Sequence, residues 1–84
     1  FRYKKNVSAI SSALDLITQM QGVTYDRKDG TSNNESGLIA EELYRVAPSL
    51  VKLDHEGKPD AVYYTRIIAY LIEAVKELRD KVDG

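Results

Sequence analysis

Few side chains in this sequence are of a type that catalyses reactions. The one histidine, His55, stands beside Glu56 and Gly57 in a run of turn-forming residues, where a histidine is normally solvated. No serine occupies a nucleophile-elbow pattern, and Ser8 is predicted to cap a helix. Lys4, considered alone, is a solvated lysine near the start of the sequence. These residues by themselves predict no complete catalytic constellation.

The acidic residues lack the partners of a metal site. Glu41 and Glu42, like Asp80 and Asp83, have spacings that suit solvated helical faces, and the sequence contains no cysteine. Protein sites for zinc or calcium gather several ligands from cysteine, histidine, carboxylate or carbonyl groups. We therefore expect no metal and no cofactor.

Charge, hydropathy and length narrow the class of protein further. The net charge is −1, from 12 basic and 13 acidic residues that are mixed along the chain. Such a chain has no basic field for nucleic acid or an anionic membrane, and no apolar run approaches the roughly 18 residues of a membrane span. We expect one soluble domain, residues 1–84, which binds neither nucleic acid nor membrane. Because its core is small and has no disulfide, oligomerisation is the expected source of additional stability.

The first half of the sequence alternates helical and extended patterns. Apolar residues at helical spacing predict an amphipathic helix over residues 7–21, which Gly22 closes. Residues 23–25 are typical of a short strand. Residues 26–37 are rich in glycine, asparagine, serine and charge, so they predict a solvated loop or hairpin tip that adds nothing to a core.

A second helix and a hairpin follow. Apolar spacing predicts a short helix over residues 38–46, which ends near Ala47 because Pro48 cannot continue it. Residues 50–53 and 61–63 favour strands, and the turn-forming residues between them predict a β-hairpin. The fold class is therefore α+β and mainly helical, with a short β-hairpin and a long helix at the end.

The last helix, predicted over residues 64–82, has the most regular pattern. Six apolar residues step by four and three along one face, and we call them the apolar seam: Tyr64, Ile68, Leu71, Val75, Leu78 and Val82. A second stripe, Ile67, Ala74 and with them Ile72, is predicted to pack on the rest of the domain, while Glu77 and Lys81 are spaced as an i,i+4 ion pair. The seam favours either self-association or an ordinary core helix, and its residue types alone do not predict a trimer.

Five segments in order resemble one known family, the peptidase S74 intramolecular chaperones of phage tail-spike, neck-appendage and tail-fibre proteins. The similarity covers practically the whole chain and lies in residues 2–7, 13–17, 22–25, 37–43 with 48–51, and the closing helix with Tyr64, Ile67, Leu71, Glu73, Ala74, Lys76, Glu77 and Leu78.

This resemblance implies a role in assembly. Members form a homotrimer, help the upstream β-structured stalk of their own precursor to fold, and are then released as the C-terminal fragment by autoproteolysis. The resemblance thus places the chain in the host cytoplasm during virion assembly, released from the mature virion protein. The loop over residues 26–37 is the segment that we expect to contact the stalk.

The resemblance also assigns chemistry to the start of the chain. The family's cleavage motif, Ser-Asp-x-x-x-Lys followed by asparagine and an aliphatic residue, places its lysine at Lys4 and its serine two residues before Phe1. The two act as a serine-lysine dyad, so this chain keeps only the lysine and is expected to be inactive. Lys5 provides a neighbouring positive charge, and Lys5, Asn6 and Glu41 are candidate neighbours of the site.

Two other functions remain open at this stage. A coiled-coil trimerisation module that never cleaves itself would use the same apolar seam. A helical adaptor that binds a different protein through Ile68, Leu71 and Val75 would be a monomer in solution.

Overall fold

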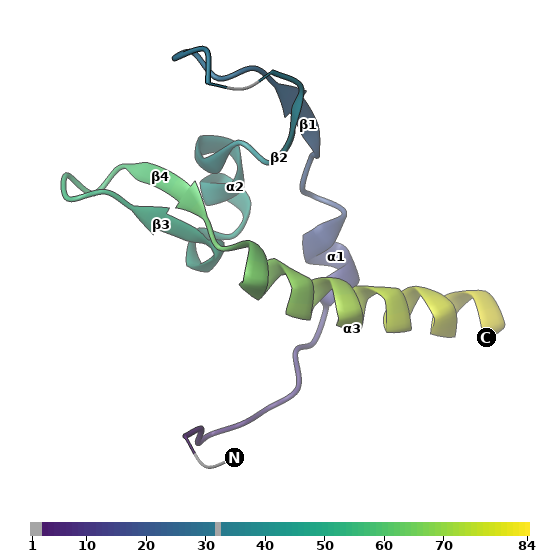
Figure 1. The fold of residues 1–84 in the computed structure, drawn as a ribbon. Coiled ribbons are helices and arrows are strands. Elements are labelled where there is room, and N and C mark those ends of the chain that lie inside the picture. The colour runs from purple at the N-terminus through teal and green to yellow at the C-terminus, as the bar shows by residue number, and fades with distance from the viewer. Residues whose placement is uncertain (1–2, 32) are drawn as a thin grey trace.

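The computed structural model describes residues 3–31 and 33–84 of the chain. Its elements are α1 (Ala13–Ile17), β1 (Val23–Tyr25), β2 (Glu35–Gly37), α2 (Ala40–Val46), the 3₁₀ turn η1 (Pro48–Leu50), β3 (Val51–Leu53), β4 (Pro59–Val62) and α3 (Tyr64–Asp83) (Figure 1). The fold is a small, mainly helical α+β domain that ends in a long helix, which confirms this part of the prediction.

The core lies where α2, η1 and β3 meet the first turns of α3. Its buried residues are Leu43, Ala47, Leu50, Val51 and Ile67, and half-buried side chains from α1, such as Leu16 and Ile17, pack against them. Leu50 is the most completely enclosed of the large side chains, with 1% of its surface exposed. This core is small, in line with the length of the chain.

The predicted hairpin over residues 50–63 is present as the antiparallel pair β3–β4. Val51 faces Val62, and the register shifts between Lys52 and Leu53. In the turn, one carboxylate oxygen of Asp54 accepts hydrogen bonds from the backbone N–H groups of Glu56 at 2.8 Å and Lys58 at 3.0 Å. Turn residues of this kind satisfy the backbone without help from the core.

A second hairpin is formed by β1 and β2, which pair antiparallel from Val23 opposite Gly37 to Tyr25 opposite Glu35. The strand at residues 23–25 was predicted. The last three residues of the predicted loop, however, belong to β2, so the tip of this hairpin spans residues 26–34 only. Glycine and serine in β2 concealed the strand, because both are uncommon in strands.

The first helix is much shorter than the predicted span of residues 7–21. It begins at Ala13 because Ser12 has a positive φ of 57°, which interrupts the helix, and Ser8 therefore caps nothing. It ends at Ile17 because the side chains of Thr18 and Gln19 both donate hydrogen bonds to the carbonyl of Asp15. Serine and threonine commonly compete with the helical backbone in this way. Residues 3–12, which we call the N-terminal arm, lie outside any helix or strand.

Helix α2 starts two residues later than predicted and ends where proline was expected to stop it. Leu38 and Ile39 are half-buried and precede the helix, and Ile39 is in an extended conformation. Pro48 opens the 3₁₀ turn η1, a position that needs no backbone N–H.

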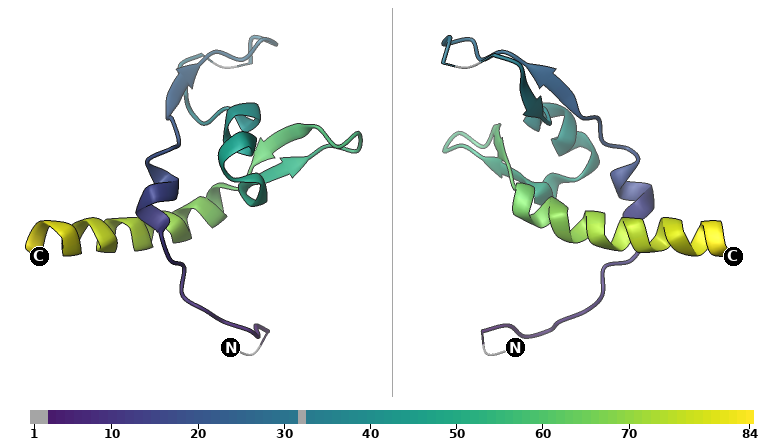
Figure 2. Two further views of the ribbon diagram at one scale, coloured as in Figure 1. Left: turned by 180° about the vertical axis from the view of Figure 1, so that it is seen from behind. Right: turned by 45° about the vertical axis from the view of Figure 1, so that its right-hand side comes forward.

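Helix α3 divides the molecule into two sides. Both hairpins and α2 lie on one side of it, whereas the N-terminal arm leaves α1 and runs out on the other (Figures 1 and 2). Of the residues in α3, Ile67 and Ala74 are buried, and Tyr70 is half-buried against the core. The predicted packing stripe is thus confirmed for Ile67 and Ala74, whereas Ile72 is 55% exposed.

The phenol of Tyr64 joins the first turn of α3 to the β1–β2 hairpin. Its oxygen accepts a hydrogen bond of 3.0 Å from the backbone N–H of Leu38. The neighbouring Gly37 permits this approach, because a Cβ atom at that position would lie 2.6 Å from the Tyr64 hydroxyl. Tyr64 is therefore a member of the apolar seam whose hydroxyl also makes a contact within its own domain.

We predict that Gly37 and Tyr64 are energetically coupled. Tyr64→Phe and Gly37→Ala should each lower the free energy of unfolding by about 0.5–1.5 kcal/mol, the usual contribution of one hydrogen bond. In the Tyr64→Phe background Gly37→Ala should cost less, because the oxygen that the new Cβ would meet is gone. Urea denaturation of the four proteins measures this. An equal cost of Gly37→Ala in both backgrounds would contradict the coupling.

Candidate functional site

The apolar seam of α3 is exposed along its whole length. Its members have between 42% and 77% of their surface accessible: Tyr64, Ile68, Leu71, Val75, Leu78 and Val82. The two buried residues of α3, Ile67 and Ala74, lie on a different stripe, which faces the core and α1. An ordinary core helix would bury its heptad face, whereas this face stays largely outside the core of its own domain, apart from the Tyr64 hydroxyl that accepts the N–H of Leu38.

The shape of the single chain also indicates missing contacts. Its radius of gyration is 15.4 Å, whereas a compact chain of this length has one of about 12 Å. Its accessible surface is 6966 Å², compared with about 5,000 Å² for a folded monomer of 9.5 kDa. The excess comes from the projecting arm, the hairpin tips and the long helix (Figure 1).

The N-terminal arm carries the candidate catalytic Lys4 and its neighbours Lys5 and Asn6, and all three are exposed. Asn6 has a positive φ of 57°, a backbone conformation that asparagine adopts more easily than most residues. Further along, residues 8–10 border a surface hollow whose other wall is α3, at Ala69, Ile72, Glu73 and Lys76.

The candidate site residues do not meet within one chain. Glu41 is exposed in the first turn of α2, which lies on the opposite side of α3 from the arm (Figure 2). Lys4, Lys5 and Asn6 are therefore brought together with one another but not with Glu41.

A contact that the sequence did not suggest joins α1 to α3. The carboxylate of Glu77 accepts a hydrogen bond of 2.7 Å from the backbone N–H of Ala13, which is fully buried. The predicted pairing of Glu77 with Lys81 is replaced by this contact. The sequence does contain a feature that could have predicted this contact. The stripe that faces the domain advances in steps of three and four and ends in a carboxylate: Ile67, Tyr70, Ala74 and Glu77.

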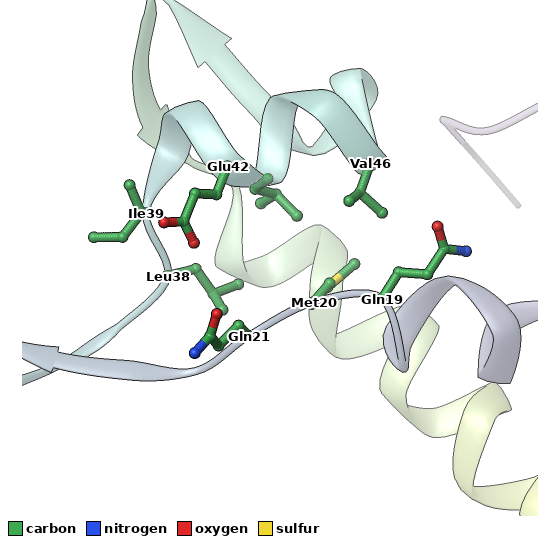
Figure 3. A pocket seen from close by; sticks show the side chains of 8 residues that line it. Gln19, Met20, Gln21, Leu38, Ile39, Glu42 and Val46 are labelled. Atoms are coloured by element: carbon green, nitrogen blue, oxygen red, sulfur yellow. The ribbon is translucent and has the colours of Figure 1, made fainter.

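A small cavity of about 90 Å³ opens between α2 and the segment that follows α1. Figure 3 shows Glu42 on the α2 side and Gln19 and Gln21 on the α1 side, with Leu38, Met20 and Val46 between them. Its lining contains no basic or nucleophilic side chain. The cavity marks the packing of α1 against α2, and we assign it no chemistry.

The tip of the β1–β2 hairpin projects from the body (Figure 1) and is held by its own polar groups. Asp26 accepts a hydrogen bond from the backbone N–H of Asn34, and Arg27 pairs with Glu35 at 3.0 Å. Hydrogen bonds from the side chain and the backbone of Thr31 lower the pKa of Asp29. Contact of this tip with a stalk stays a prediction.

Two features of the described part of the chain bear on other functions. No group of three or more histidine or acidic side chains gathers there as metal ligands. None of the helices in residues 3–31 and 33–84 has the length and apolar character needed to cross a bilayer.

Comparison with known proteins gives a family and several relatives. Residues 1–52 match the peptidase S74 family, described as chaperone of endosialidase. Over 96% of its length the chain is 32% identical to the long tail fiber protein Gp37 of Enterobacteria phage K3, and it matches that of phage T2 equally well. The identity to Gp37 of Salmonella phage S16 is 30%, again over 96% of the chain. The chain spans only 7% of the first two proteins and 14% of the third.

The fold and the uncovered seam define a class of small α+β domains whose longest helix keeps an apolar heptad face outside its own core. Within that class, the match over residues 1–52 is specific, and the chain belongs to the peptidase S74 family, the chaperones of endosialidase. The family resemblance seen in the sequence is thereby confirmed.

Proposed function

We propose that this chain is the C-terminal intramolecular chaperone of a phage tail-fibre protein. It forms a homotrimer, helps the upstream β-structured stalk of its own precursor to fold, and is then released by autoproteolysis. Membership of the chaperone family supports the role, and the three tail-fibre relatives support the kind of client. The observation that carries the proposal is the apolar seam, exposed over the length of α3.

Association through the seam would bury part of the excess surface of the single chain. That excess is about 1,900 Å², from an observed 6966 Å² and a size-based expectation of about 5,000 Å². Specific interfaces bury amounts of this order. Leu71 and Val75 lie in the middle of the seam, so they would be the most deeply buried on association. The seam favours association, and the number of three chains rests on the family likeness.

The release chemistry is assigned to Lys4 together with a serine that the family motif places before Phe1. The neutral amine of the lysine accepts the proton of the serine hydroxyl as the serine oxygen attacks the carbonyl carbon of the scissile bond. The amine then returns a proton to the leaving nitrogen, which breaks the scissile bond and leaves the acyl group as an ester on the serine oxygen. Water hydrolyses this ester, which restores the serine hydroxyl and completes release. Burial or a nearby positive charge favours the neutral form of a lysine, and Lys5 provides such a charge.

The exposure of Lys4 links this chemistry to assembly. In the single chain the arm extends into solvent on the side of α3 away from both hairpins (Figure 1), and Lys4 is exposed. Contact with neighbouring chains in the trimer is the change that would bury it. Release would then follow assembly, in the host cytoplasm, and leave the stalk in a virion-associated fibre.

We predict that Leu71→Asp dissociates the assembly. A charge in the centre of a shared apolar seam loses its hydration without gaining a partner, so the variant should sediment as single chains at micromolar concentration. Thr65→Asp places the same charge at an exposed position of α3 outside the seam and should leave the assembly intact. Sedimentation velocity distinguishes the species. If Leu71→Asp sediments like the parent chain, the seam is not the interface, and a domain that is a monomer from the start would favour the helical adaptor.

We predict that Lys4→Arg abolishes release of the precursor. Arginine nearly keeps the charge and length of lysine but stays protonated, so it cannot accept the serine proton. The variant should still assemble and appear as one long band in a denaturing gel, where the parent precursor gives two.

Lys5→Arg is the matched control, because arginine also supplies the neighbouring positive charge. It should still cleave. Normal cleavage by Lys4→Arg together with failure of Lys5→Arg would shift the assignment by one residue. Normal cleavage by both variants would refute the dyad, and a precursor that never cleaves would favour a trimerisation module alone.

A further inference from the structure

A hydrogen bond joins α3 to Ala13, the residue that directly follows the N-terminal arm. The Glu77 carboxylate accepts the 2.7 Å hydrogen bond from the backbone N–H of Ala13, across 64 positions of sequence. Ala13 has no exposed surface and Glu77 is half-buried, so the contact is shielded from water. A charge-assisted hydrogen bond in such surroundings is stronger than one between neutral groups in solvent.

The local backbone leaves this N–H without an acceptor inside its own helix. Ala13 is the first residue of α1, and the first N–H groups of a helix have no intrahelical partner. Ser12 offers no side-chain cap. Ser12 also has a φ of 57°, a strained conformation for a residue with a side chain, which persists only where the surroundings hold it. The contact with Glu77 comes one residue after this turn.

The same point determines where the arm goes. From Ser12 the chain turns along α3, so that residues 8–10 border the hollow beside Ala69, Ile72 and Lys76. Ile10 is half-buried. The arm, which includes Lys4, then runs away from both hairpins (Figure 2). The direction of the arm is therefore set relative to α3, the helix whose other face carries the apolar seam.

We propose that Glu77 is a positioning residue for release, which aims the arm that carries Lys4 only when α3 is folded and α1 is docked on it. This inference rests on the proposed autoproteolysis. Glu77 itself does not touch the reacting atoms. It fixes the arm relative to the last helix, so the arm reaches the neighbouring chains that would bury Lys4 only after that helix has folded.

The test compares three substitutions in the complete precursor, each purified in its assembled form. Glu77→Met keeps the length and helix propensity of the side chain but removes the acceptor, and it should slow release by at least about tenfold, since small misplacements of reacting groups cost this much or more. Glu77→Gln keeps an oxygen that can accept the N–H and should release within about threefold of the parent. Asp83→Ala removes a carboxylate that pairs only with exposed Arg79, at 3.4 Å, and should release normally. Release is followed by denaturing gel, and the melting temperature of each assembly is measured alongside.

The comparison of Glu77→Gln with Glu77→Met separates an effect on the position of the arm from an effect on the stability of the assembly. The expected result is slow release by assembled Glu77→Met, with Gln and Asp83→Ala close to the parent. Parental release by assembled Glu77→Met would overturn the proposal. Slow release by Gln would overturn it too, and so would a failure of Glu77→Met to assemble, because the contact would then serve assembly alone. Two other outcomes would contradict the proposed function and not the role of Glu77. These are a parent precursor that does not cleave and normal cleavage of the Lys4→Arg precursor, whatever the release rates of the Glu77 variants.

Discussion

The packing of α3 against a small core is the interaction on which the rest of the structure depends. Ile67 is buried among residues of α2, η1 and β3, and Ala74 is buried on the same stripe of α3. One stripe of the helix is thus occupied by its own chain, which leaves the apolar seam turned outward. A helix of 20 residues is too long to be covered by a domain with so few buried residues, so its outer face gains burial only from atoms outside this domain.

Two polar contacts extend this packing to the parts of the chain that the core does not reach. Near the start of α3, Tyr64 accepts the N–H of Leu38 and holds the β1–β2 hairpin. Near its end, Glu77 accepts the N–H of Ala13 and holds α1 with the N-terminal arm. Both acceptors lie on the helix that carries the seam. The first turn of α3 is therefore linked to the base of the β1–β2 hairpin, and the part near its end to the start of α1.

Much of this organisation was predictable from the sequence because it follows from local periodicity. The seam, the stripe with Ile67 and Ala74, the stop at Pro48 and the β3–β4 hairpin depend on residues close together in the chain, and all but the use of the seam are confirmed. The start of α1 was not predictable in this way, since Ser12 is held in a left-handed conformation next to a contact with distant Glu77. The hydroxyl of Tyr64 was missed for the same reason, because its partner is 26 positions away. The role of Lys4 rests on the family resemblance and on a serine that the motif places before Phe1, so it stays a prediction.

We propose that the apolar seam is an interface between copies of this chain. Sedimentation equilibrium of the unmodified chain over a range of concentrations tests this proposal. We expect a mass three times the 9.5 kDa of the single chain at micromolar concentration, with dissociation only on strong dilution. A mass equal to one chain that does not change with concentration would contradict it.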